Sequence, residues 1–444
     1  MIRAALALAC LLAVPVPAAE TFALPNGLKV LLLPDPSVPV VTLGWGVDVG
    51  SRQEPRGLSG FAHLFEHLTF QGSAHVPRGG YEKVLERFGA DSNAFTSSDR
   101  TYYYVRLPAH AWTTALWLEA DRLSTLDIST RSLRNQVDVV KEERRQSVEG
   151  EPYAPLLTVE VASRTFTNWA NAHDGYGSAA DLDAAKLKDA RAFFRAHYAP
   201  REIRLALAGD FEPEAARAAL TKYLGWIPNR LEPARTVSTD EPPAVGGRTF
   251  AVMDANAALP GSAFLWRVDP ARGSREYWAL ALLGRYLGLG PAARLRTALV
   301  KEAKAASSID HPYAGGLGFP TNSDDDFKAP GFFGFFILRR PETTPARLKE
   351  LFLAEVSSVA AAGIPPAALD RVKARFAGDV ARARQTTTGR AEAAVRAWLL
   401  DGHPDALSTE LETAMTITVE ETREAAARWL APAAMDVFEL EPGP

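Results

Sequence analysis

Two histidines and a glutamate stand close together in the segment His63-Leu64-Phe65-Glu66-His67. On a helix, positions i, i+3 and i+4 lie on one face, so the three polar side chains would point the same way. Two imidazoles one turn apart can hold one Zn²⁺ ion at roughly 2.0–2.1 Å each. A carboxylate between them lies near such a metal without having to bind it. The spacing therefore indicates part of a zinc site.

A catalytic zinc ion needs a third protein ligand and one position open for water. Glu143 is the candidate, on a predicted helix 143 − 67 = 76 residues after His67. Its neighbour Glu142 would face about 100° away on the same helix. The alternative is that the two histidines are ordinary solvated helix residues. With 8 histidines in 444 residues, the five-residue pattern arises by chance in roughly one chain in a hundred.

The hydrophobic pattern predicts the elements that must position these residues. In the N-terminal half we expect strands over residues 28–33, 40–49, 102–107 and 203–208. We expect helices over residues 60–70, 81–88, 112–123, 132–150, 184–197 and 213–224. The histidine motif and Glu143 thus fall on two different predicted helices, which the fold would have to bring together.

The chain divides into two halves. Residues 232–247 are polar, contain proline and glycine and lack any periodicity, which predicts a linker between domains 20–231 and 248–444. RAFFRAHYAP at Arg191 to Pro200 is similar to REAAARWLAP at Arg423 to Pro432, and each precedes an apolar, strand-like run. We therefore expect a duplicated α+β domain, with the candidate zinc residues in the first copy.

The N-terminus has the pattern of a secretory signal peptide over residues 1–19. Arg3 precedes an uncharged apolar run, and the small residues that follow predict cleavage after Ala18 or Ala19. A membrane anchor would need about 20 apolar residues, and this run is shorter. Cys10 is the only cysteine. These features predict an exported protein, periplasmic or extracellular, without disulfides and with no stable membrane span.

The composition is that of an ordinary globular protein, with 47% hydrophobic and 23% charged residues. The formal net charge is −4. Nucleic-acid binding usually needs a basic face, so the sequence argues against nucleic acid as a main partner.

The segment GSRQEPRGLSGFAHLFEHLTFQGS, Gly50 to Ser73, resembles the zinc-binding region of the pitrilysin family, which includes insulin-degrading enzyme and the mitochondrial processing peptidases. Further matches follow in the family's order: SNAFTSSDRTYYYVRLP from Ser92, NQVDVVKEERRQ from Asn135, and a long segment from Gly177. The similarity is dense in the N-terminal half and thin in the C-terminal half.

The resemblance implies two homologous α+β domains, each a mixed β-sheet with helices packed on one face. It implies that His63, His67 and Glu143 hold one Zn²⁺ per chain and that Glu66 activates the attacking water. The chain would then be a zinc metalloendopeptidase that cleaves peptides or unfolded polypeptides inside a chamber. The substrate would add as a β-strand along the residues Asn93, Ala94, Phe95 and Thr96.

Two positions depart from the family pattern. Better-known members carry another glutamate seven residues before the glutamate ligand, where this chain has Gln136; we expect a neutral amide here to act as a second-shell hydrogen-bond partner of a ligand. Members also often carry an arginine and a tyrosine, seven apart, that hold the substrate carbonyl. The matching positions here are Val300 and Ser307. Long members enclose their chamber with four such domains, so we expect a dimer.

We expect the partner to be a related, zinc-less subunit that supplies the arginine and tyrosine, with a homodimer as the alternative. Two other functions compete with a peptidase of broad specificity. One is a non-catalytic scaffold or assembly subunit, although such relatives usually lose the histidines or the glutamate. The other is a processing peptidase with one dedicated substrate.

Overall fold

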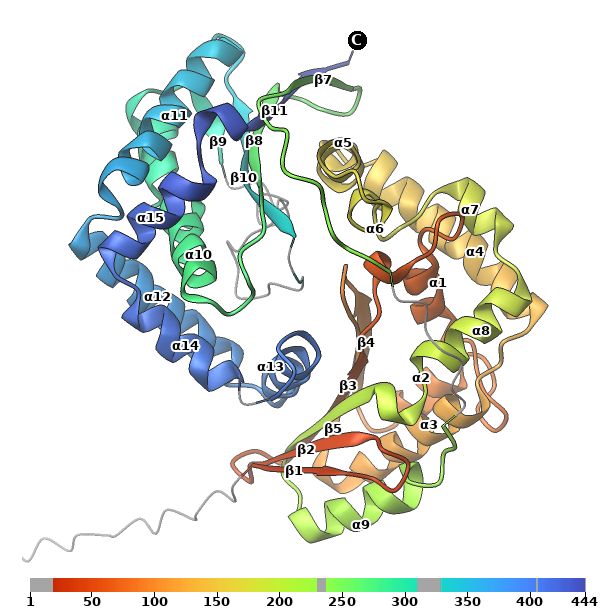
Figure 1. Cartoon of the computed structure of the whole chain (residues 1–444). Helices are drawn as coiled ribbons and strands as arrows, with labels where there is room; N and C mark the ends of the chain where they lie inside the picture. The colour runs from red at the N-terminus through yellow and green to blue at the C-terminus, as the bar shows by residue number, and fades with distance from the viewer. Residues whose placement is uncertain (1–18, 230–236, 310–327, 329, 405, 444) are drawn as a thin grey trace, which may run out of the picture.

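The computed structural model describes residues 19–229, 237–309, 328, 330–404 and 406–443, and within them each half of the chain builds one β-sheet (Figure 1). The predicted signal peptide up to residue 18, and residues 232–236 of the predicted linker, lie outside the described residues. The described part of that linker, residues 237–247, contains no helix or strand.

The first sheet has six strands in the order β1-β2-β6-β3-β5-β4. It is mixed, because β2 and β6 pair in parallel while the other neighbours are antiparallel. Strand β4 lies at the edge, with β5 on one side only. The strands are β1 (Glu20–Ala23), β2 (Lys29–Pro34), β3 (Val40–Val47), β4 (Asp91–Thr96), β5 (Thr101–Pro108) and β6 (Ile203–Gly209).

The second sheet has five strands in the order β7-β11-β8-β10-β9 and is also mixed, with β7 and β11 parallel. Its strands are β7 (Thr249–Asp254), β8 (Gly261–Val268), β9 (Ala306–Ser308), β10 (Gly331–Arg339) and β11 (Asp436–Pro442). The prediction of two α+β domains with mixed sheets is confirmed.

Each sheet is covered on one face by helices of its own half, which build two separate cores. In the first half these helices are α1 (Phe61–Leu68), α2 (Gly80–Glu86), α3 (Trp112–Thr125), α4 (Thr130–Arg144), α8 (Leu187–His197) and α9 (Pro213–Leu224). In the second half they are α10 (Arg275–Gly288), α11 (Pro345–Ala362), α12 (Pro366–Ala383), α14 (Ala406–Thr416) and α15 (Val419–Trp429).

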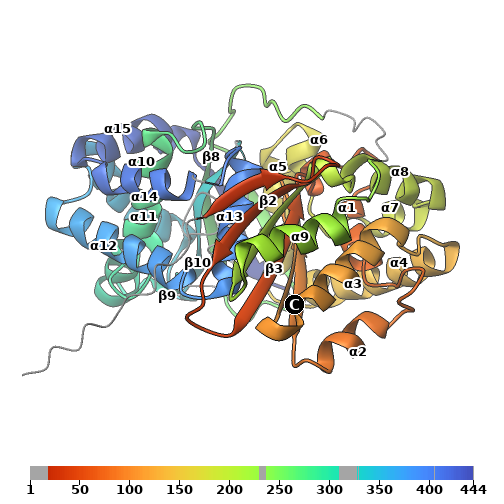
Figure 2. The same ribbon diagram turned by 90° about the horizontal axis from the view of Figure 1, so that it is seen from below.

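The opposite face of the first sheet is covered by a helix of the second half, α13 (Thr387–Leu400), which lies between the two halves (Figures 1 and 2). The sheet presents small residues to it. A Cβ on Gly44 would come within 2.3 Å of the Tyr102 hydroxyl and 3.2 Å of Ala391, and a Cβ on Gly46 would come within 3.0 Å of Leu399. The glycines of β3 therefore allow α13 to lie close against the strands.

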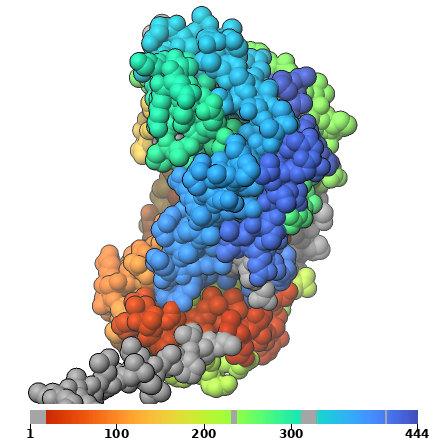
Figure 3. Space-filling model, turned by 90° about the vertical axis from the view of Figure 1, so that its left-hand side faces the viewer, coloured from red at the N-terminus to blue at the C-terminus, as the bar shows by residue number. Residues whose placement is uncertain are grey.

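The first half in turn covers one face of the second sheet. The π-helical turn Pro155–Glu160 and helix α5 (Val161–Thr165) of the first half pack on the second sheet through Leu156 and Val161, together with Tyr153 just before them. Their partners there include Leu265, Phe336 and Phe438. Because each sheet is buried on both faces, its central strands are apolar in nearly continuous runs, as in β2 and β8. On the face shown in Figure 3, atoms of the second half (blue) lie directly against those of the N-terminal residues (red).

The structure refines several predicted elements. The helix expected over residues 132–150 is α4 followed by a π-helical turn, Arg145–Glu149. The helix expected from residue 184 begins at Leu187, since Ala185 and Lys186 are extended. Strand β1 was not predicted. Among the described residues no single helix is long and apolar enough to cross a bilayer; one pair, α11 and α12, meets that test together but is bent by 100°.

Candidate metal centre

Helix α1 carries the histidine motif and exposes one of its faces to a cleft. Leu64, Phe65 and Leu68 are buried in the core of the first half. The remaining face carries the three polar residues of the motif, and all three line the cleft. Helix α4 packs beside α1 and brings Glu143 to the same place. The apolar period of each helix thus decides which way its polar residues point.

The structure brings His63, His67 and Glu143 together. The two histidine Nε2 atoms are 3.2 Å apart. One carboxylate oxygen of Glu143 lies 3.2 Å from His67 Nε2 and the other 3.7 Å from His63 Nε2. Among the residues that the structure describes, this is the one group of three or more histidine, cysteine or acidic side chains whose ligand atoms come within 4.8 Å of one another.

These distances fit a zinc ion. Two ligands that each sit about 2.0–2.1 Å from a tetrahedral ion are roughly 3.3–3.4 Å apart. The three observed separations lie close to that value. Two imidazoles and one carboxylate are also a donor set of catalytic zinc sites, which leave a fourth position open. The donor set and its spacing therefore suit one Zn²⁺ ion.

Glu66 lies beside this group and is buried, with 8% of its surface exposed. The Thr96 hydroxyl donates a hydrogen bond of 2.6 Å to its Oε2 atom. Burial raises the pKa of Glu66 to about 7, although this hydrogen bond and His67 lower it. A carboxylate poised near neutral pH and held in place by one hydrogen bond is suited to accept and return a proton.

The pKa values of the histidines and Glu143 reflect their mutual contacts. Burial, with His67 nearby, lowers the pKa of His63 to about 4. Burial also lowers the pKa of His67, but the hydrogen bond and charge of Glu143 outweigh it and raise that pKa overall. The same hydrogen bond lowers the pKa of Glu143. Neutral His63 and ionised Glu143 are the protonation states that a metal ion needs.

The neighbouring predicted residues take different positions. Glu142 points away from the group: it is half exposed and accepts hydrogen bonds from Arg145 and Gln146. Gln136 is buried on α4, and its side-chain hydrogen bond contributes to raising the pKa of His67. Both placements are compatible with the predicted roles, which stay predictions.

The predicted substrate strand lies at the sheet edge that faces the cleft. Asn93, Ala94, Phe95 and Thr96 belong to β4, and all four line the cleft. Within the described residues β4 pairs only with β5, and no strand lies along its other edge. A backbone edge next to a candidate metal site could take up an extended peptide.

The cleft has a volume of about 690 Å³ and is lined by both halves of the chain. The second half contributes Pro330, Gly331 and Phe332. The first half contributes Phe166, whose ring lies 4.5 Å from that of Phe332 and is tilted by 36° to it. Sequence reasoning missed Arg52, Asn171 and His173, which also line it. Arg52 lies inside the segment used for the family resemblance and donates a hydrogen bond to Asn171, 119 positions later. Nothing in the residue pattern indicates that these two side chains meet.

The two positions that depart from the family's clamp lie in the second half. Val300 is in the π-helical segment Arg296–Glu302 and packs against the core of that half. Ser307 is in β9, one of the two edge strands of the second sheet as the structure describes it. Neither residue lines the cleft that contains the histidines.

Comparison with known proteins matches both halves to one family. Residues 29–173 match the profile described as Insulinase (Peptidase family M16), and residues 184–376 match the one described as Peptidase M16 inactive domain. The zinc protease PqqE of Helicobacter pylori is 30% identical over 298 residues, which are 66% of this chain and 66% of that protein. A probable mitochondrial-processing peptidase subunit beta of Arabidopsis thaliana is 25% identical over 243 residues, 55% of this chain and 45% of that protein.

The match thus spans just under two thirds of the first relative and less than half of the second. A crystal structure of a protease from Helicobacter pylori has the same fold, with a TM-score of 0.86 and 24% identity, covering 96% of this chain and 100% of that one.

Proposed function

Because the chain belongs to the insulinase family of peptidases, peptidase family M16, we propose that it is a zinc-dependent metalloendopeptidase. The observation that carries the proposal is the convergence of His63, His67, Glu143 and Glu66 on one cleft beside β4, the edge strand of the first sheet. The three ligand candidates suit one Zn²⁺ per chain, and the fourth residue remains available as a base.

We assign the following roles in peptide hydrolysis to the protein's own groups and to the metal ion. A bound Zn²⁺ ion supplies Lewis acidity, which lowers the pKa of a water molecule and polarises the scissile carbonyl. Glu66 takes the proton from the attacking water and passes it to the leaving amine. Thr96 holds the Glu66 carboxylate through its hydroxyl. The backbone of β4 binds the substrate as an added strand.

We propose short peptides or unfolded polypeptides as substrates, because an extended chain is what a strand edge can bind. We also propose that a second subunit completes the site. Val300 and Ser307 cannot replace an arginine and a tyrosine, and the Arabidopsis relative is itself called a subunit. A related, zinc-less chain is the expected partner and a second copy the alternative. The signal-peptide pattern of residues 1–19 supports export to the periplasm or the exterior.

The test compares the purified mature chain with the Glu66→Gln variant, measuring zinc content and cleavage of a set of unstructured peptides. We expect one zinc per chain in both and cleavage only by the unmodified chain. Zinc without cleavage in either would indicate a missing partner, and cleavage should then appear when the partner is added. A chain without zinc would favour a scaffold subunit instead.

A further inference from the structure

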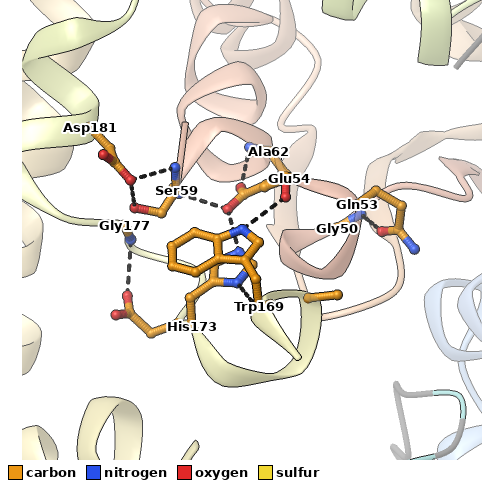
Figure 4. A network of polar contacts seen from close by, with 12 residues as sticks. Gly50, Gln53, Glu54, Ser59, Ala62, Trp169, His173, Gly177 and Asp181 are labelled. Carbon is orange, nitrogen blue, oxygen red and sulfur yellow. Dashed lines mark hydrogen bonds and ion pairs between the residues drawn. The ribbon is translucent and has the colours of Figure 1, made fainter. Parts of the chain in front are cut away.

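The helix that carries the histidine motif receives its N-terminal cap from elsewhere in the chain. Helix α1 begins after Gly60, whose φ of 79° and missing side chain leave no cap at that position. The first backbone N–H groups of a helix need acceptors outside it. Glu54 provides them: its carboxylate oxygens accept from Gly60 N at 2.8 Å and from Ala62 N at 2.7 Å (Figure 4).

Glu54 is completely buried, and its counter-ion is His173, a residue 119 positions later. His173 Nδ1 lies 2.6 Å from the Trp169 carbonyl oxygen, to which it must donate. His173 Nε2 lies 3.0 Å from Glu54 Oε2, so these two groups share one proton. Burial raises the pKa of Glu54 to about 7. Burial lowers the pKa of His173, but the hydrogen bond that it donates to the Glu54 carboxylate outweighs this and raises the pKa overall. The helix N–H groups favour the ionised carboxylate.

Trp169 contacts both members of the Glu54–His173 pair. Its indole ring stacks on the His173 imidazole at 4.3 Å, and its Nε1–H donates to the Glu54 carbonyl oxygen at 3.1 Å (Figure 4). The main chain and side chain of Glu54 are therefore both held by one short segment, residues 169–173.

The chain that follows also contacts both helices of the metal centre. Asp174 accepts a hydrogen bond of 3.1 Å from Arg144, the residue next to Glu143. The Tyr176 carbonyl is so close to Gly60 that a Cβ there would lie 2.3 Å from its oxygen. Asp181 accepts from both the backbone and the hydroxyl of Ser59. Residues 169–181 thus fix the start of α1 relative to the end of α4.

This segment is itself anchored to the linker between the two halves. Asn168 donates to the carbonyls of Ser238 and Asp240, and Asn171 donates to the Thr239 carbonyl and the Glu241 carboxylate. The segment that holds Glu54 is therefore also fixed to the linker between the two halves.

We propose that Glu54 and His173 are positioning residues of the peptidase, which hold helix α1 so that the His63 and His67 nitrogens face Glu143. This rests on the proposed zinc site. Neither residue touches the three ligand candidates through any hydrogen bond that the structure shows; they act through the backbone of α1 and through residues 169–181. The pair is buried and mutually neutralised, so removing one member leaves the other as an uncompensated group.

The test measures zinc affinity by competition with a chromophoric chelator for the full mature chain. Glu54→Gln, His173→Gln and the double variant are compared. We expect each single variant to bind zinc about 10- to 100-fold more weakly, as for partners that orient ligands. We expect the fold-loss of zinc affinity in the double variant to be smaller than the product of the losses in the two single variants. The first substitution already breaks the Glu54–His173 pair, so the second has no such contact left to remove. The visible spectrum of the Co²⁺-loaded chain should change in each variant, and kcat should fall more than KM rises.

Thr344→Ala is the matched control. Thr344 caps α11 in the other half by accepting from Arg347 N at 3.2 Å. Its loss should lower the unfolding temperature without changing zinc affinity or the Co²⁺ spectrum, because no residue of α11 lines the cleft.

Four results would overturn the inference. The first is a folded Glu54→Gln or His173→Gln variant with unchanged zinc affinity and turnover. The second is an equal loss of zinc affinity in Thr344→Ala, which would make the effect one of general stability. The third is failure of both single variants to fold, which would make the pair a folding element. The fourth is an unmodified chain without zinc, which refutes the proposed function as well, whereas the first three refute this inference alone.

Discussion

The hydrogen bond from Thr96 to Glu66 gives a prediction that separates base positioning from substrate binding. Thr96→Val keeps the shape of the side chain and the backbone of β4 but removes the hydroxyl that donates to Glu66 Oε2 at 2.6 Å. A hydrogen bond to a charged group contributes about 1.5–3 kcal/mol. Because about 1.4 kcal/mol corresponds to a factor of ten, its loss should raise the pKa of Glu66 by roughly one to two units.

The expected consequence is a fall in kcat of about 10- to 100-fold at pH 7, since less of the base is ionised and its carboxylate is free to turn. The sign follows from the contact: the hydrogen bond lowers the pKa of Glu66, so removing it moves the acidic limb of the kcat profile to higher pH. KM should change little, because the peptide is expected to pair with the backbone of β4.

The assay is cleavage of a fluorogenic peptide from pH 5.5 to 9, with zinc content measured on the same samples. Thr96→Ser is the matched control, because it retains the hydroxyl and should keep most of the activity. A Thr96→Val enzyme with full zinc, unchanged kcat and an unshifted acidic limb would refute the assigned role of this hydrogen bond.

Three further predictions follow from particular contacts. Glu143→Gln should cost most of the bound zinc while Glu142→Gln keeps it, since Glu142 pairs with Arg145 instead; equal zinc content in the two variants would contradict this. Burial lowers the pKa of His197 to about 4 from an ordinary 6.5, so the neutral ring stabilises the fold above pH 6.5 and this contribution is lost as the pH falls through 4. His197→Gln should therefore lose about 3 kcal/mol less stability than the unmodified chain between pH 7 and pH 4, measured by urea unfolding; parallel pH curves would exclude it. Trp398→Ala removes a buried ring of α13 from the first sheet and should cost about 3–5 kcal/mol in one cooperative thermal transition; separate transitions for the two halves would show that α13 does not couple them.

The family resemblance drawn from the histidine motif is confirmed by both profile matches, and so is the two-domain α+β fold. These features were predictable because they depend on local patterns. The period of Leu64, Phe65 and Leu68 forms a helix with one apolar face, and that alone aims His63 and His67 to one side. Strands β2 and β3 were predictable from their apolar runs.

Other features were beyond the residue pattern. From the sequence, Gly44 and Gly46 could be interpreted only as residues of a glycine-rich strand. In the structure they make room for α13, a helix that follows some 340 positions later. Local propensity describes how a strand forms but not which element covers its second face. The helices that each half exchanges with the other therefore became visible only in three dimensions.

The sequence by itself determined the chemistry available to this protein: two imidazoles one helical turn apart, a glutamate between them and a strand segment that resembles a substrate edge. Helical and strand periods arise from short-range backbone geometry, so neighbouring residues suffice to specify them. The tertiary structure placed Glu143, already the candidate from the sequence, against the two histidines. It alone decided that Thr96 holds Glu66 and that His173 neutralises Glu54. Those pairings depend on how packed helices and strands are rotated and placed against one another, which contacts between distant residues set and no local pattern encodes.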